Sequence, residues 1–210
     1  MNQALIVLDN FYEEPEKIRK LALSLDYQEK EDATYPGKEA YISNSQWLDT
    51  WNYLKDKIED DVTFSGQKKP PFLQGKFRIA LAADELKRKD LVHEDVQKWS
   101  AVVYLSLPNH CKGGVAFYRH KKTGCTSASK EWIQDTFSEV LSERPHSLKD
   151  ELRKHFKDES QWEKIGEIPM FYNRVVILMA HCFHGSTGVF GAQKDNGRLT
   201  QHFEFYSYDS

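Results

Sequence analysis

Apolar residues recur along the chain with two different spacings, and these separate a helical N-terminal part from a later strand-rich part. A short apolar run that ends at Asp9 predicts a first strand at residues 5–9. From Pro15 onward, apolar positions recur every three or four residues, as on one face of a helix that begins at this proline. The same spacing predicts a second helix, whose apolar face comprises Trp47, Trp51, Leu54 and Ile58.

Beyond the Pro70-Pro71 pair, apolar and aromatic residues alternate with polar ones, which is typical of half-buried strands. The alternation predicts five strands, at residues 72–83, 99–107, 115–119, 174–180 and 199–208.

A polar segment at residues 124–170 interrupts these strands. Two apolar stripes with helical spacing run through it, and they comprise Ile133, Phe137 and Val140, followed by Leu148, Leu152 and Phe156. We therefore expect a helical insertion here. The chain is predicted to form one domain over residues 1–210, with an N-terminal strand and helices at 1–70, a β-core at 72–123 and 171–210, and the insertion at 124–170.

The charge balance argues against two large classes of partner. Lys and Arg number 29 against 32 Asp and Glu, the formal net charge is −3, and basic residues form no long run. Nucleic acids and anionic membrane surfaces are bound through basic clusters, so the composition favours a small-molecule partner instead.

We expect a cytoplasmic protein without a signal peptide or a membrane span. The apolar stretch at residues 4–8 has no basic residues before it and no small-residue cleavage site after it. No apolar stretch approaches the roughly 18 residues of a spanning helix. The three cysteines, Cys111, Cys125 and Cys182, have no zinc-like spacing, and we expect them to be reduced thiols.

A possible metal-binding motif, His93-Glu94-Asp95, lies just before the strand predicted at residues 99–107. Such a motif alone is weak evidence, since His202-Phe203-Glu204 has a similar form.

The order of further residues along the chain makes the first motif more specific. His181 and His184 follow the strand predicted at residues 174–180, and Arg198 stands at the beginning of the last predicted strand. A His-x-Asp at a strand edge, a distal His after another strand and an Arg that begins the next strand form an ordered set.

With this set, the sequence resembles the Fe(II)- and 2-oxoglutarate-dependent dioxygenases, specifically their small bacterial prolyl-hydroxylase-like branch. The resemblance implies a mainly β fold, with a double-stranded β-helix of the jelly-roll or cupin-like kind and flanking helices. It also implies Fe(II) and 2-oxoglutarate as cofactors. It covers most of the chain, and the matching segments are Val7-Leu8-Asp9-Asn10-Phe11 followed by Pro15, Tyr35-Pro36-Gly37, His93-Glu94-Asp95, Tyr104-Leu105, Gly113-Gly114, Asn173-Arg174, Phe183-His184-Gly185 and Arg198-Leu199-Thr200-Gln201.

We predict His93, Asp95 and His184 as the metal ligands and catalytic residues. His93 and Asp95 are two positions apart, so in an extended backbone their side chains point to the same side. Two imidazoles and one carboxylate leave sites open on an octahedral ion for a cosubstrate and oxygen. The resembling family places its distal His after a Phe, which favours His184 over His181. A hydrogen-bonded turn is the alternative interpretation of the first two residues.

Arg198 and Thr200 are predicted to bind 2-oxoglutarate. Alternation places them on one face of the last strand together with His202, and a guanidinium is well matched to a carboxylate. In the resembling family, an Arg followed two residues later by a hydroxyl residue binds the C5 carboxylate. Tyr104 is expected to join them by the same resemblance. A water-exposed Arg and an ordinary core tyrosine are the alternative interpretations.

The resemblance implies hydroxylation of a small organic substrate by O2, with release of succinate and CO2. A free amino acid or a similar metabolite is favoured, with Arg78 as the residue that binds its carboxylate, although this side chain could equally face water. The insertion at 124–170 lies between the segments that carry the metal ligands, so we expect it to cover the pocket as a lid. The alternatives are a cupin-like metal enzyme that uses no 2-oxoglutarate and a jelly-roll binding module without catalysis.

Overall fold

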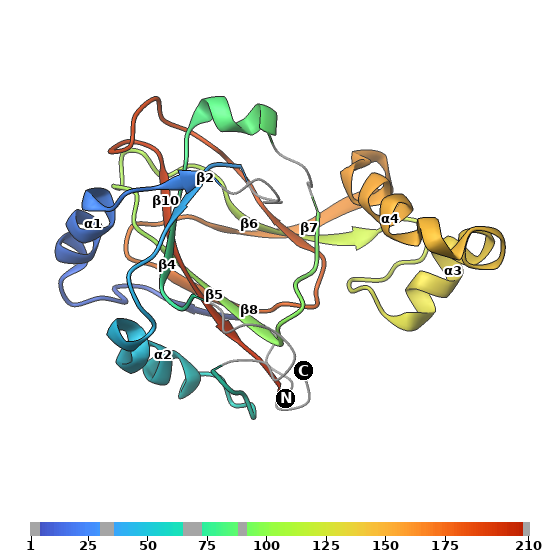
Figure 1. Ribbon diagram of the computed structural model, residues 1–210, viewed down its shortest axis with the longest axis horizontal. Helices are drawn as coiled ribbons and strands as arrows, with labels where there is room; N and C mark the ends of the chain where they lie inside the picture. Colours follow the sequence, from blue (N-terminus) through green and yellow to red (C-terminus); the bar gives the residue numbers. More distant parts are fainter. Residues whose placement is uncertain (1–4, 30–35, 65–72, 88–91, 208–210) are drawn as a thin grey trace.

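The computed structural model describes residues 5–29, 36–64, 73–87 and 92–207, and it is built on two antiparallel sheets (Figure 1). The larger sheet has seven strands in the order β1-β8-β5-β10-β4-β3-β2. The smaller sheet has three, in the order β7-β6-β9. In the large sheet the strands are β1 (Leu5–Leu8), β2 (Gln28–Glu29), β3 (Lys38–Ala40), β4 (Lys76–Ala80), β5 (Trp99–Tyr104), β8 (Val175–Met179) and β10 (Arg198–Phe205), and in the small sheet β6 (Gly114–His120), β7 (Trp162–Pro169) and β9 (His184–Ser186).

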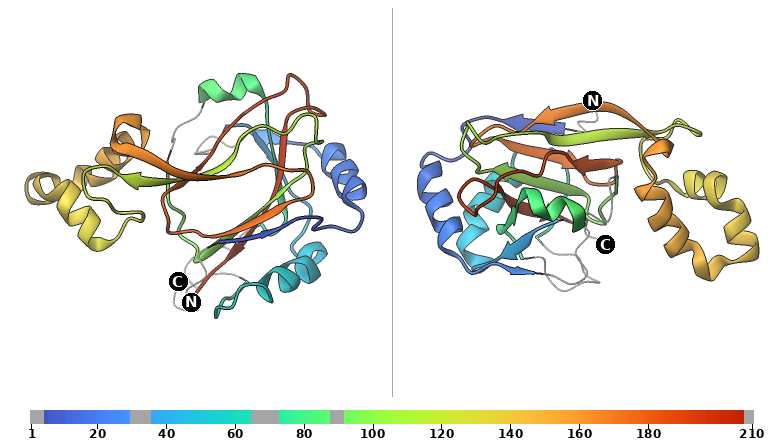
Figure 2. Two further views of the ribbon diagram at one scale, coloured as in Figure 1. Left: turned by 180° about the vertical axis from the view of Figure 1, so that it is seen from behind. Right: turned by 90° about the horizontal axis from the view of Figure 1, so that it is seen from above.

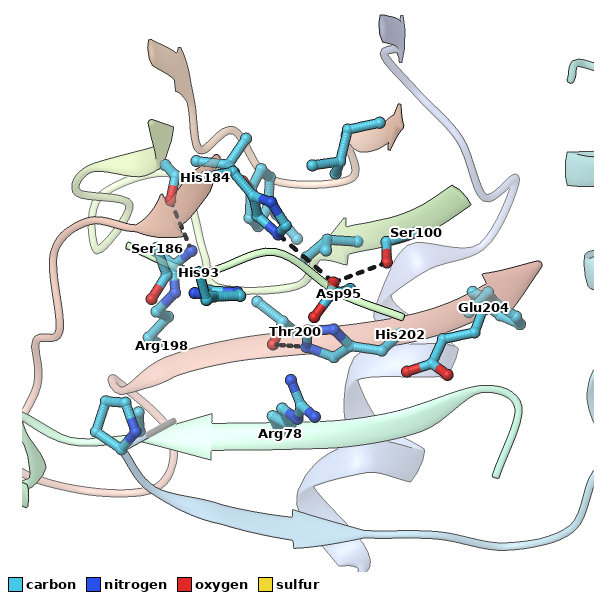
Figure 3. A pocket seen from close by; sticks show the side chains of 18 of the residues that line it. Arg78, His93, Asp95, Ser100, His184, Ser186, Arg198, Thr200, His202 and Glu204 are labelled. Carbon is cyan, nitrogen blue, oxygen red and sulfur yellow. Dashed lines mark hydrogen bonds and ion pairs between the residues drawn. The ribbon is translucent and has the colours of Figure 1, made fainter. Parts of the chain in front are cut away.

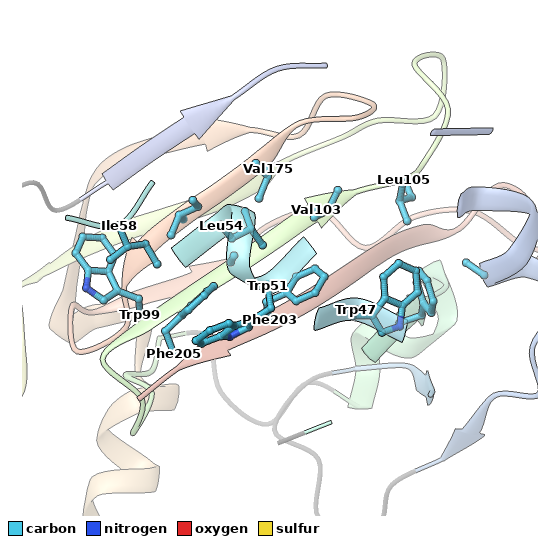
Figure 4. Close-up of a cluster of buried hydrophobic side chains, with 14 of the residues drawn as sticks. Trp47, Trp51, Leu54, Ile58, Trp99, Val103, Leu105, Val175, Phe203 and Phe205 are labelled. Carbon is cyan, nitrogen blue, oxygen red and sulfur yellow. The ribbon is translucent and has the colours of Figure 1, made fainter. Parts of the chain in front are cut away.

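Two N-terminal helices contribute to the hydrophobic core on one face of the large sheet. They are α1 (Pro15–Ser24) and α2 (Leu48–Lys55), the second preceded by a short 3-10 turn at Ser45–Trp47. Trp51 stacks on Phe205 with ring centroids 5.2 Å apart (Figure 4). Trp47 meets Phe77 edge to face. Burying such large aromatic side chains contributes strongly to stability, so this layer anchors the sheet that carries the pocket.

Successive side chains of β10 point alternately to the two faces of the large sheet. Leu199, Phe203 and Phe205 are buried in the core beside the two N-terminal helices. Residues at the intervening positions line a pocket on the other face. One strand thus supplies a hydrophobic core on one side and polar groups on the other, as the period of two requires.

The helices of the insertion form an arm that extends from the end of the small sheet. We call residues 121–161 the helical arm; its main helices are α3 (Lys130–Glu143) and α4 (Leu148–Lys157). Both lie beyond the ends of β6 and β7, to one side of the sheets (Figure 2). Trp132, Trp162 and Phe183 form a separate hydrophobic cluster that joins the arm to the rest of the molecule.

Two expectations for the insertion are wrong. Residues 162–169 are not part of a helical segment but form β7, which pairs with β6 along its whole length. The arm is also not a lid, because no described residue of 121–161 lines the pocket. The residues of its apolar stripes instead pack in the cluster that contains Trp132 and Trp162.

Most other elements agree with the sequence pattern. The first strand, both N-terminal helices, both insertion helices and the cores of all five predicted strands are present. Four short or irregular strands were not predicted: β2, β3, β7 and β9. Residue 72 of the first long predicted strand and residue 208 of the last lie outside the described residues. The three cysteines are free thiols, as expected. None of the helices in the described part of the chain is both long and apolar enough to cross a membrane.

Candidate active site

A pocket lies between the two sheets and is lined by residues from β4, β5, β6, β8, β9 and β10, together with the segment that contains His93 and Asp95. All seven residues that the sequence nominated line this one pocket: Arg78, His93, Asp95, Tyr104, His184, Arg198 and Thr200. His181 does not, and its side chain is exposed.

Backbone pairing brings the two candidate histidines together. The amide of His93 donates to the carbonyl of His184 at 2.9 Å, and the amide of His184 donates to the carbonyl of His93 at the same distance. Directly paired residues of antiparallel strands direct their side chains to the same face, so the two rings lie with centroids 4.5 Å apart. The Asp95 amide continues this pairing by donating to the Ala180 carbonyl at 2.8 Å.

His93, Asp95 and His184 form a cluster suited to a metal ion (Figure 3). One potential ligand atom from each lies within 4.8 Å of the others, and the described residues contain no second cluster of this kind. The Nε2 atom of His184 is 3.5 Å from Asp95 Oδ2. The other ring nitrogen of His184, Nδ1, is 2.8 Å from the Cys182 carbonyl oxygen, which orients the ring and leaves Nε2 facing the cluster.

A hydrogen-bonded chain orients the Asp95 carboxylate. The Ser100 hydroxyl donates to Asp95 Oδ2 at 3.1 Å, and the Gln97 side-chain amide donates to the Ser100 oxygen at 2.5 Å. Burial alone would raise the pKa of Asp95, but hydrogen bonding and attraction to His184 hold it well below its usual range. The same contacts hold the pKa of His184 above its usual value, although burial opposes them. The carboxylate therefore stays ionised, as a metal ligand must be.

Arg198 stands at one end of the inward-facing row of β10, with its guanidinium buried. It donates to the carbonyl oxygens of Gly114 at 3.0 Å, Thr187 at 3.0 Å and Gly188 at 3.3 Å. These neutral acceptors fix the direction of the guanidinium. The charge lies 5.5 Å from the centre of the Tyr104 ring.

Tyr104 provides a polar atom suited to a carboxylate beside Arg198. Its hydroxyl is completely buried and makes no hydrogen bond of acceptable geometry within the described residues. Burial raises the pKa of Tyr104, so the hydroxyl stays protonated and can donate. A buried donor without a partner is costly, and an anionic ligand at Arg198 would satisfy it. Thr200 is paired with Tyr104 across the strands and hydrogen-bonds to His202 at 2.8 Å.

Arg78 lies on β4, the neighbour of β10 in the large sheet, where it is paired with Thr200 on the same wall of the pocket. Its Nε donates to Glu39 Oε1 at 2.7 Å, and the Lys76 ammonium lies 3.1 Å from the same oxygen. Desolvation lowers the pKa of Lys76 to about 8, with the neighbouring Arg78 charge acting in the same direction and Glu39 opposing it. The alternative of a water-exposed Arg78 does not hold, since its side chain is only 17% exposed.

Sequence reasoning assigned no role to two polar residues of this pocket. His202 and Glu204 both line it because they continue the inward face of β10. The alternation had already placed His202 on that face, whereas Glu204 was noted only as part of a motif that resembles His93-Glu94-Asp95. The alternation along β10 was the signal that could have identified Glu204. Burial lowers the pKa of His202 well below its usual value, with the Arg78, Lys76 and Arg198 charges adding to this. Burial raises the pKa of Glu204 to about 7.

Comparison with known proteins places the chain in a family. A family described as one of unknown function, DUF6445, matches residues 1–205. The chain belongs to this family. Among curated proteins, the sequence has no significant match.

Solved structures show the fold that this family member shares with other proteins. HygX from Streptomyces hygroscopicus, with nickel and 2-oxoglutarate bound, is 14% identical, with a TM-score of 0.54; the match covers 97% of this chain and 83% of HygX. HygX with nickel, 2-oxoglutarate and hygromycin B bound is 15% identical, with a TM-score of 0.53 and the same coverage. The predicted double-stranded β-helix is thereby confirmed.

Proposed function

We propose that this DUF6445 member is an Fe(II)- and 2-oxoglutarate-dependent oxygenase that hydroxylates a small organic substrate and releases succinate and CO2. The observation that carries the proposal is the position of His93, Asp95 and His184 in the same pocket as Arg198 and Tyr104. Two imidazoles and one carboxylate with open positions are the donor set of mononuclear iron(II) oxygenases. The ligands bound to HygX, which has the same fold, support this choice.

Each residue has a role in this proposal. His93, Asp95 and His184 hold the ion, while Ser100 and the Cys182 carbonyl orient two of these ligands. The ion would bind the cosubstrate and oxygen and so supply the oxidising chemistry.

The far carboxylate of 2-oxoglutarate would meet the Arg198 guanidinium and the unsatisfied Tyr104 hydroxyl, with the Thr200 hydroxyl nearby. A guanidinium fork and a phenol donor match the acceptor geometry of a carboxylate. Two finer points of this proposal rest on the sequence pattern. They are the assignment to the prolyl-hydroxylase-like branch and the choice of hydroxylation over another oxidation.

A substrate would enter along the wall formed by Arg78, and its carboxylate would bind there. The surrounding pocket suits a small molecule, since it lies between the two sheets and its polar groups converge from several strands. A binding module without catalysis is the competing hypothesis, and it predicts no turnover of 2-oxoglutarate under any condition.

The test is metal binding combined with succinate release. The purified protein should bind one Fe(II) per chain, with Mn(II), Co(II) or Ni(II) able to substitute, and should consume 2-oxoglutarate only when Fe(II) is present. Asp95→Ala and His184→Ala should each abolish turnover, while His181→Ala, on an exposed residue, should retain it. Full activity in His184→Ala would reject the proposed site.

A further inference from the structure

Behind the pocket, backbone carbonyl oxygens fix the direction of the Arg198 guanidinium. Nη2 donates to Gly114, at the beginning of β6, at 3.0 Å. Nη1 donates to Thr187 at 3.0 Å and to Gly188 at 3.3 Å, both of which follow the last residue of β9. Peptide carbonyls move only with the planar peptide units that contain them, so the guanidinium points where these two chain segments place their oxygens. Whatever holds the two segments together therefore matters for a ligand of Arg198.

The backbones of Gly114 and Thr187 pair directly, through long hydrogen bonds. The Thr187 amide donates to the Gly114 carbonyl at 3.1 Å, and the Gly114 amide donates to the Thr187 carbonyl at 3.2 Å. Backbone hydrogen bonds are most often about 2.9 to 3.0 Å long. Each of the two carbonyls also accepts from Arg198. Backbone pairing alone thus fixes these acceptors only weakly, at a point where β9 has already ended.

The Thr187 hydroxyl adds a side-chain hydrogen bond to this pairing. Its Oγ1 accepts from the Gly114 amide at 2.8 Å and donates to Glu167 Oε1 at 2.5 Å. The second distance is typical of a hydroxyl that donates to a carboxylate. A hydroxyl has one proton, so when that proton points to Glu167 a lone pair is left for the amide. Contacts therefore run without a break from the Glu167 carboxylate, on β7, to Arg198.

The Glu167 carboxylate is ionised and held in place. The Lys164 ammonium donates to its Oε2 at 2.9 Å. The hydrogen bond from Thr187 lowers the pKa of Glu167, and contact with Lys164 and the Arg198 charge act in the same direction, while burial opposes them. An ionised acceptor binds a hydroxyl about twice as strongly as a neutral one. Glu167 is therefore a firm anchor for the Thr187 hydroxyl.

Thr187 and Glu167 act from outside the pocket. Neither lines it, whereas Gly114 does. The backbone between them and the pocket has little room to adjust, because a Cβ on Gly113 would lie 2.2 Å from the Thr187 carbonyl oxygen. In so close a contact, a change at the Thr187 side chain is passed to the carbonyls that Arg198 binds.

We propose that Thr187 and Glu167 are positioning residues for 2-oxoglutarate. The Thr187 hydroxyl, oriented by Glu167, fixes the carbonyls that direct the Arg198 guanidinium toward the C5 carboxylate. This inference rests on the proposed function and adds to it two residues that touch no ligand. It implies that both residues affect recognition of the C5 carboxylate and leave metal chelation by the other end of the cosubstrate unchanged.

The experiment compares two ligands that differ only at the end bound by Arg198. Protein loaded with Mn(II) under argon is titrated by calorimetry with 2-oxoglutarate and with 2-oxopentanoate, which has the same 2-oxo acid group but a methyl group in place of the C5 carboxylate. The ratio of the two dissociation constants measures recognition of that carboxylate. The wild type should prefer 2-oxoglutarate.

Variants of the two residues should change this ratio in a graded way. Thr187→Val removes the hydroxyl at nearly constant shape and should reduce the preference about tenfold, while Thr187→Ser should restore most of it. Glu167→Ala should have a smaller effect. Thr187→Val combined with Glu167→Ala should match Thr187→Val alone, because Glu167 acts through the hydroxyl. In every variant, the affinities for Mn(II) and 2-oxopentanoate should equal those of the wild type.

Two matched controls lie outside this chain of contacts. Thr123 also accepts a hydrogen bond from a backbone amide, that of Cys125, but in the helical arm, and Thr123→Val should keep the wild-type ratio. Glu163 lies on β7 with Glu167 and forms an exposed ion pair with Arg119, so Glu163→Ala should keep the ratio too.

Three results would overturn the inference. They are a wild-type ratio in Thr187→Val, an equal loss of affinity for both ligands, which indicates a merely structural role, and no recovery in Thr187→Ser. In these cases the proposed function stands without the two positioning residues. A wild-type protein that binds no Mn(II), or that shows no preference for 2-oxoglutarate over 2-oxopentanoate, would instead reject the proposed function, and this inference with it.

Discussion

Two histidine pairs, one in the pocket and one at the base of the helical arm, show how the surroundings decide what a histidine can do. In the pocket, His93 and His184 lie beside the Asp95 carboxylate. At the base of the arm, His120 at the end of β6 and His155 in α4 face each other, with their Nε2 atoms 3.0 Å apart. Their neighbours are aromatic side chains, among them Trp132 and Trp162.

The pKa of one histidine in each pair is shifted in opposite directions. Contact with Asp95 raises the pKa of His184 despite its burial. Burial lowers the pKa of His120 to about 4, and the His155 and Lys122 charges act in the same direction. One pair is therefore adapted to cations and the other to a neutral, aromatic environment. The comparison teaches that a carboxylate within reach, rather than a pair of histidines, distinguishes a candidate metal site from packing.

The arm should be important for stability and unimportant for the pocket. Trp132→Ala removes the fully buried ring at the centre of the arm cluster, so we expect the free energy of unfolding to fall by about 3–5 kcal/mol. Urea denaturation measures this loss. The affinity of the folded protein for 2-oxoglutarate should be unchanged. Trp132→Phe, which leaves a smaller cavity, should lose less, and a parallel fall in 2-oxoglutarate affinity would show that the two regions are coupled.

The reverse result is expected for Arg198 in the pocket. Removal of a buried charge partner costs on the order of 3 to 5 kcal/mol, so Arg198→Ala should raise the dissociation constant for 2-oxoglutarate by roughly a hundredfold or more. Thr200→Ala should have a smaller effect. Calorimetry on Mn(II)-loaded protein measures both. Because Arg198 also binds three backbone carbonyls, Arg198→Lys serves as a second variant that keeps the charge; wild-type affinity in Arg198→Ala would remove the residue from the site.

A hydrogen bond to a metal ligand should have an intermediate effect. Ser100→Ala removes the donor that orients Asp95, and we expect metal affinity to fall by about 10- to 100-fold. Ser100→Thr, which keeps a hydroxyl, should recover most of it. Ser142→Ala, on the exposed side of α3, is the control from the other region. Competition with a fluorescent chelator measures the affinity, and equal values for Ser100→Ala and Ser142→Ala would contradict the role of Ser100.

The smallest expected effect is a pH dependence of stability contributed by the pair of His120 and His155. His120 is protonated near pH 6.5 when unfolded but only near pH 4 when folded, so the unfolded state binds more protons between these values. The free energy of unfolding should therefore fall as the pH is lowered from 6.5 to 4. Replacing both residues of the pair, in His120→Phe with His155→Phe, should flatten this dependence relative to the wild type. Other groups titrate equally in the wild type and the double variant, so the difference between their two stability-against-pH curves isolates the pair. His146 is an exposed residue of the arm, and the control His146→Gln should give the same curve as the wild type.

Much of the secondary structure was predictable because it depends on local periodicity. The stripe from Trp47 to Leu54 and the alternation along β10 each bury one face, and any fold of this chain must cover those faces. The short strands β2 and β9 carry no such pattern. They form because a neighbouring strand offers hydrogen bonds, which is a property of tertiary contact.

The helical arm is a second case in which the sequence pattern predicted the elements but not their tertiary contacts. The apolar stripes that include Ile133 and Leu148 predicted its helices, but these stripes do not indicate which surface the helices cover. In the structure they pack around Trp162 and Phe183 and leave the pocket untouched. A lid and a laterally placed arm have the same helical pattern, so only the tertiary structure could separate them.

By itself, the sequence nominated the residues to which the proposed function assigns the chemistry: a His-x-Asp, a distal His and an Arg followed by Thr two positions later. The type of ligand atom depends on residue identity, and the side of a strand to which a side chain points depends on its spacing along the chain. Both are local properties. The tertiary structure alone decided that His93 pairs with His184 through their backbones, that His181 lies outside the pocket, and that Glu204 lines the pocket beside Ser100. These relations join segments far apart in the chain, and strand register, which sets them, depends on packing across the whole sheet.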